Sequence, residues 1–327
     1  MSATNSHTDS ERPPVRKRRR LIVLCVVGLL LCGLALGYRH FWYSHPMGTG
    51  PAGPRVDRNA FATTWTEQPV LLVGLGDSVT AGFGSSPGHS YFKRLLKNPS
   101  NEFADMQGIC LSKVIPNIEA RNHSLSGSTS LECLDVLLPK LEVQDEKTIG
   151  VVVLTTGGND IIHNYGRTPP REHAMYGATV KQARPWIDNF RDRLQTILDA
   201  IDSRFPAGCH IFLANIYDPT DDVGDAHHAG LPSWTDGLAV IGEYNGVIED
   251  VITQRDNVHL IDMHGAFLGH GIHCVKFWAK HYDAGDPHYW YYDNLEDPND
   301  RGYDALRRLF LLKMAEVLPD AFGRVEK

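Results

Sequence analysis

Residues 70–86 read VLLVGLGDSVTAGFGSS, and this stretch decides the fold prediction. Five of the six residues at 70–75 are apolar, and the chain then turns small and polar at Gly76, Asp77 and Ser78. An apolar run of this length is typical of a strand that is buried on both faces of a sheet. The Asp–Ser pair therefore follows directly after a buried strand, at a turn from strand to helix.

Strand and helix patterns alternate along the rest of the chain. Apolar strands separated by helices predict an α/β fold with a parallel sheet covered on both faces. In such sheets a ligand binds beyond the carboxyl ends of the strands, so polar residues after each strand should gather at one edge. Further strands are expected at 117–122, 149–155, 209–216 and 258–263, and helices near 89–97, 129–141, 180–203, 236–254 and 302–318.

The composition excludes some classes of protein. The 327 residues are 42% hydrophobic, which is enough for one large core. The formal net charge is −7, and no basic footprint of a nucleic-acid-binding protein is present in the part after the N-terminus. We therefore expect no nucleic-acid partner.

The N-terminus has the pattern of a membrane segment. RKRRR at 16–20 precedes an uncharged run, LIVLCVVGLLLCGLALGY, at 21–38. The run is at the short end of what spans a hydrocarbon core of ~30 Å, and Trp42 and Tyr43 after it suit a membrane interface. The positive block predicts that the N-terminus stays in the cytoplasm and that the rest of the chain is exported.

We favour a retained signal anchor over three alternatives, which are a cleaved signal peptide, a lipoprotein and a buried soluble helix. No A-x-A cleavage site follows the apolar run. The predicted organisation is a cytoplasmic basic tail at 1–20, a transmembrane anchor at 21–38, a linker at 39–68 that is rich in Gly and Pro, and one folded domain at 69–327. The domain would lie on the extracytoplasmic side of the membrane.

Four cysteines belong to the folded part. Four cysteines allow three pairings, and the sequence does not choose among them. No C-x-x-C is present, so a structural zinc site is not expected. The residues in question are Cys110, Cys133, Cys209 and Cys274.

The residues after the first three strands suit acyl transfer. Ser78 follows the first strand, Gly127 lies in NHSLSGSTS after the second, and Asn159 lies in TTGGNDIIHN after the third. A serine nucleophile needs a base that takes its proton and donors that hold the oxyanion. Gly127 lets a backbone N–H approach that oxyanion, and Asn159 offers a side-chain amide for the same purpose.

The blocks GLGDSVTAGFG and TTGGND, with a glycine in the loop between them, resemble the first three blocks of the SGNH (GDSL-type) hydrolases over residues 69–318. The resemblance implies a flavodoxin-like three-layer α/β/α fold and an ester or acyl hydrolase that needs no cofactor. It also implies that Ser78 is the nucleophile. The oxyanion hole would consist of the Ser78 N–H, the Gly127 N–H and the Asn159 side chain, while Asp77 would order the turn.

The fourth block of the family departs from the pattern. The family has D-x-x-H before the last helix, often followed by Pro-Asn. Here residues 291–308 read YYDNLEDPNDRGYDALRR, in which Pro298 and Asn299 are present. The histidine position holds Asp297 and the aspartate position holds Asn294. The expected base is therefore absent.

Four explanations of the missing base are open. We favour His288 as the base, oriented by Asp286 or Asp297. Asp297 could itself be the base, DAHH at 225–228 could supply it, or the protein could be a non-catalytic relative. Other histidines of the same connection are His270, His273 and His281.

The sequence thus predicts an exported, membrane-anchored serine esterase that hydrolyses O-acyl esters, on envelope carbohydrate or lipid. An O-acyltransferase and a catalytically silent carbohydrate-binding relative are the alternatives. A metal site in the histidine-rich segment is not favoured, because no H-E-x-x-H or similar signature occurs there.

Overall fold

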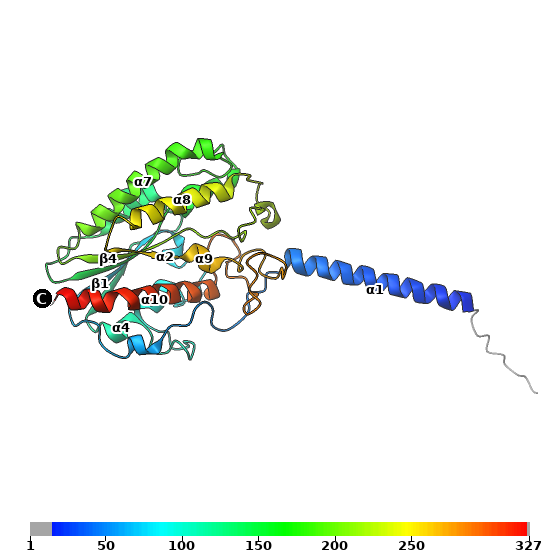
Figure 1. The fold of residues 1–327 in the computed structure, drawn as a ribbon, viewed down its shortest axis with the longest axis horizontal. Coiled ribbons are helices and arrows are strands. Elements are labelled where there is room, and N and C mark those ends of the chain that lie inside the picture. Colours follow the sequence, from blue (N-terminus) through cyan, green and yellow to red (C-terminus); the bar gives the residue numbers. More distant parts are fainter. Residues whose placement is uncertain (1–14, 326–327) are drawn as a thin grey trace, which may run out of the picture. The chain divides into compact units, whose positions relative to one another are not determined.

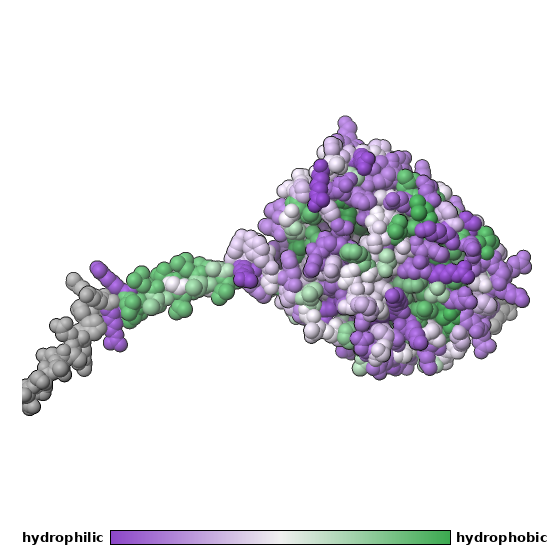
Figure 2. All heavy atoms as spheres, turned by 180° about the vertical axis from the view of Figure 1, so that it is seen from behind, coloured by the Kyte–Doolittle hydropathy of each residue, from purple (hydrophilic) through white to green (hydrophobic). Residues whose placement is uncertain are grey.

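A computed structural model describes residues 15–325 (Figure 1). The chain divides into two compact units, with the boundary in the sequence between Ser44 and His45. The first unit contains a single helix, α1 (Val15–Tyr43). Hydrophobic side chains cover most of this helix (Figure 2). It is long and apolar enough to cross a membrane, and a signal sequence would have the same properties.

The second unit is built on a five-stranded parallel sheet in the order β2-β1-β3-β4-β5. This order is the flavodoxin-like one, so the predicted α/β class is confirmed. In the register of the sheet, Gly76 pairs with Thr155, so β1 and β3 end side by side. The strands are β1 (Val70–Gly76), β2 (Ile118–Asn122), β3 (Ile149–Thr155), β4 (Cys209–Ala214) and β5 (Val258–Ile261).

Helices cover both faces of the sheet (Figure 1). On one face α7 (Val180–Asp202) packs beside α8 (Gly237–Ile252). On the other, α10 (Asp300–Val325) packs against α3 (Tyr91–Leu96). The buried side chains of α7 recur with helical spacing, at Ala183, Ile187, Phe190, Leu194, Ile197, Leu198 and Ile201.

The remaining elements are short and lie mostly in the connections. The α-helical ones are α2 (Ser78–Ala81), α4 (Leu111–Val114), α5 (Ser130–Glu132), α6 (Gly158–Ile162) and α9 (Met263–Phe267). The others are η1 (Arg58–Phe61), the π-helical turn η2 (Cys133–Leu137), η3 (Leu138–Lys140), η4 (His163–Gly166) and η5 (Ala226–Ala229).

The strands β4 and β5 end two residues earlier than the sequence predicts. The reason is a side-chain contact at their carboxyl ends, where the Asn215 amide donates to Asp262 Oδ1 at 2.9 Å. Asp262 in turn caps α9 by accepting the Gly265 N–H. The strand edge is therefore replaced by the start of a helix.

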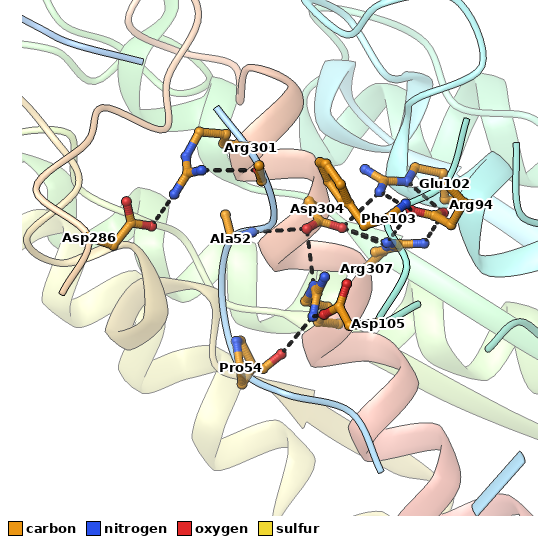
Figure 3. Close-up of polar contacts among 12 residues, drawn as sticks. Ala52, Pro54, Arg94, Glu102, Phe103, Asp105, Asp286, Arg301, Asp304 and Arg307 are labelled. Carbon is orange, nitrogen blue, oxygen red and sulfur yellow. Dashed lines mark hydrogen bonds and ion pairs between the residues drawn. The ribbon is translucent and has the colours of Figure 1, made fainter. Parts of the chain in front are cut away.

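The segment from His45 to residue 68, which the sequence assigns to a linker, belongs to the second compact unit. The buried Ala52 N–H donates to Asp304 Oδ2 at 3.0 Å, and the Arg301 guanidinium donates to the carbonyls of Thr49 and Gly50 (Figure 3). These partners lie about 250 positions further along the chain, so the Gly- and Pro-rich composition alone gave no sign of them.

A buried ionic network joins α3 and α10 (Figure 3). Glu102 binds both Arg94 and Arg307, each at 2.7 Å or less. Asp304 also contacts both of these arginines, at 2.9 and 2.7 Å. These two carboxylates and two guanidinium groups are at most 2% exposed. A third buried guanidinium, Arg308, also contacts Asp304 at 3.1 Å, and its charge is balanced by the half-exposed Asp105 at 2.7 Å.

All six cysteines are free thiols in the structure, and the four in the second unit are buried. Burial raises the pKa of Cys133 and Cys274 to about 12. Within residues 15–325, no group of three or more His, Cys, Asp or Glu side chains is arranged to hold a metal ion.

Candidate active site

Ser78 lies at the end of β1, at the first residue of α2. The turn depends on Gly76, which has φ +118°, because a Cβ there would overlap the carbonyl oxygen of Thr155. Asp77 caps α2 by accepting the Val79 N–H at 3.1 Å. Ser78 is 9% exposed, so its hydroxyl lies at the surface of a recess rather than in open solvent.

Asp77 also forms a hydrogen bond with the neighbouring strand, β3. Its Oδ1 accepts the Thr155 hydroxyl at 2.7 Å, and Thr155 is joined through Thr80 to the Tyr91 hydroxyl. Burial, with a smaller contribution from the charge of Asp297, raises the pKa of Asp77 to about 7. These contacts give Asp77 a structural role in the turn.

Asn159 lies in the first turn of α6, after β3, and Gly127 lies in the loop after β2. Gly127 has φ +82° in a turn that is held by a Ser128 hydroxyl bond to the Gly76 carbonyl. The Asn159 amide donates to the Ser128 carbonyl at 3.1 Å, so it is tied to the turn that contains Gly127. Within residues 15–325, the N–H groups of Ser78 and Gly127 have no hydrogen-bond acceptor. They remain available to an incoming oxygen.

Asp297 takes the position where the family has its histidine. Its carboxyl group is 2% exposed, and its Oδ2 accepts the Asn294 amide at 2.6 Å. Burial raises the pKa of Asp297, while contacts with the Ser78 hydroxyl and with Asn294 lower it in part. The Ser78 contact does not meet standard hydrogen-bond geometry, and Asp297 Oδ1 has no partner within the described residues. Asp297 is therefore one titratable group of the last connection that contacts Ser78.

Asn299 fixes the end of the long connection that precedes α10. The Asn299 amide donates to the carbonyls of Tyr289 and Tyr291, and its Oδ1 accepts the N–H groups of Arg301 and Gly302 at the start of α10. The Pro-Asn pair of the motif thus locks the path of the chain directly after Asp297.

Glu296 is a site residue that the sequence analysis missed. It lines the same pocket as Ser78, and burial together with the charge of Asp297 raises its pKa to about 7. The Tyr217 hydroxyl donates to the backbone carbonyl of Glu296. Its position beside Asp297 in LEDPND was the available signal, but an acidic residue in a loop is usually solvated.

The structure places His288 in a different cavity. Its Nδ1 bonds Asp286 Oδ1 at 2.5 Å, and Arg301 bonds the other oxygen of Asp286. These residues line a second cavity of about 440 Å³ with His270 and Trp290, whose rings stack at 3.5 Å. This cavity shares no lining residue with the Ser78 pocket. Its contact with Asp286, which Arg301 also binds, holds His288 in this second cavity.

The other histidines considered are also held elsewhere. His273 and His228 both bind Asp225, at 2.8 and 2.6 Å, so the DAHH motif forms its own cluster. His281 lies 3.2 Å from Asp222. None of these histidines lines the Ser78 pocket.

The pocket beside Ser78 has a volume of about 120 Å³. Ser78, Asn159 and Glu296 lie among its polar residues, whereas Gly127 does not line it. Most of the remaining lining is apolar or aromatic, and it comes from α6, η4, α8 and the loops between them. This part includes Ile161, Ile162, Tyr165, Tyr176, Ile216, Leu231, Trp234, Leu238 and Ile241.

Comparison with known proteins defines the class. The model of the GDSL-like Lipase/Acylhydrolase family matches residues 75–305, which is more than half of the chain. The protein therefore belongs to this family, which includes the SGNH hydrolases. No curated protein is similar enough to match.

Several solved structures are similar to this chain at low identity. An extracellular lipase from Streptomyces rimosus is 20% identical, with 75% of this chain and 99% of that chain covered and a TM-score of 0.46. Axe2, an acetylxylan esterase from Geobacillus stearothermophilus, is 16% identical, with 77% and 96% covered and a TM-score of 0.47. A member of the lipolytic G-D-S-L family from Veillonella parvula is 15% identical, with 76% and 97% covered and a TM-score of 0.42.

Proposed function

We propose that the protein is a serine esterase in which Ser78 attacks the carbonyl carbon of an O-acyl ester. The observation that carries the proposal is the position of Ser78 on the α2 turn, with its own N–H and that of Gly127 unpaired and Asn159 in the same pocket. Preorganised donors of this kind stabilise a tetrahedral oxyanion, and removal of one typically costs ~10²–10³ in kcat.

Asp297 is the base in this mechanism, in place of His288. As Ser78 Oγ bonds to the carbonyl carbon, its proton passes to the free Oδ1 of Asp297, and the carbonyl electrons move onto the oxygen. The Asn294 amide bonds to Oδ2, while Oδ1 has no hydrogen-bond partner among the described residues. When the intermediate collapses, the C–O bond breaks and the leaving alcohol takes the proton back from Asp297. Water then attacks the acyl-serine with the same base, and the acid is released.

An aspartate is a weak base at its ordinary pKa, but burial raises the pKa of Asp297 and so brings its basicity closer to that of the missing histidine. The neighbouring Asp77, with a pKa of about 7, is protonated below neutral pH. In that form it adds no charge against the ionised Asp297. Asp77 is then the neutral carboxyl group next to Ser78, and Asp297 is the one that accepts the proton.

The substrate carries an apolar acyl group. The pocket next to Ser78 is lined mainly by apolar and aromatic side chains such as Ile161 and Leu238. Its polar groups include the Tyr165 hydroxyl, which has no partner among the described residues, and the Trp234 N–H. That N–H is already bound to the Ala178 carbonyl at 2.7 Å. Such a lining favours an alkyl or aryl acyl chain over acetate.

We place the enzyme at a membrane, with α1 as a retained anchor and the second unit on the extracytoplasmic side. The basic residues Arg18 to Arg20 before an apolar helix support this orientation.

Labelling with a fluorophosphonate tests the mechanism, because this probe reacts with an activated serine. The full chain in detergent is compared with its Ser78→Ala, Asp297→Asn and His288→Ala variants. We expect labelling of the wild type and of His288→Ala, none of Ser78→Ala, and at least ~10²-fold slower labelling of Asp297→Asn. Loss of labelling in His288→Ala but not in Asp297→Asn would identify His288, and not Asp297, as the base. A wild-type chain that does not label would favour a catalytically silent relative.

A further inference from the structure

The two adjacent carboxylic acids at 296 and 297 lie differently toward the Ser78 pocket. Glu296 lines this pocket, whereas Asp297 does not. Asp297 is 2% exposed, while Glu296 is partly exposed, and no group within residues 15–325 donates a hydrogen bond to the Glu296 carboxylate. A substrate in this pocket therefore lies beside Glu296 rather than beside Asp297.

The backbone on both sides of Glu296 is held in place. Leu295, which also lines the pocket, has a left-handed backbone with φ +68°, a conformation that leucine rarely adopts. The Tyr217 hydroxyl donates to the Glu296 carbonyl, and the Glu296 N–H donates to Asn294 Oδ1 at 3.3 Å. Strained backbone of this kind persists where surrounding contacts hold it, and it is found most often at active sites. These contacts fix the position of Glu296 at the pocket.

Few of the groups that line this pocket can carry a proton near neutral pH. Among the described residues, no Lys, Arg or His side chain lines it, and its tyrosines have an ordinary pKa of ~10. Of its carboxylic acids, Asp77 is bound to the α2 turn and to β3, and Asp218 accepts the Thr220 hydroxyl at 2.7 Å. Glu296 is therefore the carboxyl group of the lining that is left free for a substrate.

Two effects keep a proton on Glu296. Burial, and after it the negative charge of the adjacent Asp297, raise the pKa of Glu296 to about 7. Glu296 is therefore protonated on the acid side of neutral pH and exchanges its proton near pH 7, where general acid–base catalysis is most effective. An alkoxide is a poor leaving group, so a proton donor in the pocket speeds the release of an alcohol.

We propose that Glu296 is a second proton carrier of the esterase reaction and acts on the alcohol portion of the substrate. The inference rests on the proposed function and changes one step of it, because the proton of the leaving alcohol comes from Glu296 instead of Asp297. In acylation the ester C–O bond breaks as Glu296 gives its proton to the alcohol oxygen, and the proton of Ser78 stays on Asp297.

Deacylation restores both carboxyl groups. Ionised Glu296 takes a proton from the water whose oxygen bonds to the acyl carbon. The bond between that carbon and Ser78 Oγ then breaks, and Oγ recovers its proton from Asp297. The free acid leaves, with Glu296 protonated and Asp297 ionised as at the start.

Two esters of one acid separate this role from a structural one. Ethyl butyrate releases ethanol and needs a proton donor, whereas 4-nitrophenyl butyrate releases a stable anion and needs none. The values of kcat/KM, which report acylation, are measured for both esters with the full chain in detergent. Glu296→Gln is compared with the wild type and with Asp293→Asn, which removes an exposed carboxylate of the same connection outside the pocket. Circular dichroism checks that each protein is folded.

We expect Glu296→Gln to lower kcat/KM by roughly 10²-fold for the ethyl ester and to leave it unchanged for the nitrophenyl ester. With the nitrophenyl ester this variant should show a burst of nitrophenol, because its deacylation is slow. The wild-type kcat/KM for the ethyl ester should fall above pH about 7, and Glu296→Gln should lack this descending limb. Asp293→Asn should behave as the wild type does with both esters.

Equal losses of kcat/KM for the two esters, or no loss for either, would overturn the inference and leave the esterase proposal intact. A wild type that hydrolyses neither ester would instead overturn the esterase proposal, and this inference with it.

Discussion

Burial raises the pKa of Asp297 and contact with the Ser78 hydroxyl lowers it in part, and Asp297 stands at the position where the family has a histidine. Asp297 lies in the last connection and Ser78 follows the first strand, so the two are 219 positions apart in the chain. Asn294 donates to one oxygen of the Asp297 carboxyl group, and the other oxygen is buried without a hydrogen-bond partner among the described residues. A carboxyl group thus stands where the family has an imidazole, and under the proposed mechanism it accepts the proton of Ser78.

This pair predicts an unusual pH dependence. The base must be ionised to accept a proton, and burial raises the pKa of Asp297 above the ordinary value of 3.8. Activity should therefore rise with pH through this raised pKa and fall as the pH drops below it. The acidic limb of the pH profile of kcat/KM, measured with a soluble ester, reports this pKa. Asp297→Asn should lower kcat by ~10²–10⁴ and abolish the limb, and a variant with unchanged kcat would exclude Asp297 as the base.

Restoring the family motif should change the base without changing the fold. The double variant Asn294→Asp/Asp297→His places D-x-x-H before α10. We expect it to be more active than Asp297→Asn, with an acidic limb near the ordinary histidine pKa of ~6.5. The single variant Asn294→Asp is the control, because it adds a second carboxylate without the imidazole. A double variant as inactive as Asp297→Asn would show that this position does not reach the nucleophile.

The apolar pocket predicts a preference in acyl chain length. Leu238 lines the pocket, and Leu238→Trp should fill part of it. Each buried methylene contributes ~0.8 kcal/mol, so removing room for two or three of them should lower the ratio of kcat/KM for octanoyl over acetyl esters by roughly 10–50-fold. Val143→Trp, at an exposed position outside the pocket, should leave the ratio unchanged. A ratio that is equal in both variants would mean that the acyl chain lies elsewhere.

The ionic network between α3 and α10 predicts a loss of stability in acid. Burial works to raise the pKa of Glu102, but its bonds to Arg94 and Arg307 outweigh burial and lower the pKa to about 2. The contribution of Glu102 is thus complete above its ordinary pKa of ~4.3 and is lost as the pH falls toward 2.

Urea unfolding of wild type and Glu102→Gln measures this contribution. At neutral pH the variant should be less stable by about 3–5 kcal/mol, because two buried arginines lose a partner. The difference between the two proteins should shrink steadily below pH ~4.3. Glu67→Gln, which changes a carboxylate outside the network, should show no such convergence. A difference that stays constant with pH would mean that Glu102 is not ionised in the folded protein.

The sequence by itself determined the strands and helices, because their apolar residues recur at the regular spacing of each element. The apolar run before Asp77 specified β1, and the period of the buried residues of α7, with the capping box at Thr179 and Gln182, specified that helix and its start. Because parallel strands end at one edge, the positions of Ser78 and Asn159 after two strands sufficed to bring them into one pocket. The spacing of apolar and polar residues within each element is enough to predict these strands and helices, so no knowledge of long-range contacts was needed.

The tertiary structure alone decided the path of the last connection and where the folded unit begins. That connection has no periodic pattern, and its path depends on single long-range bonds. Asn299 fixes Asp297 beside the site, and Arg301 holds Asp286 and with it His288 in another cavity. The same helix captures the backbone near Ala52 through Asp304. Partners so far apart in the chain leave no mark on local composition, and only folding brings them together.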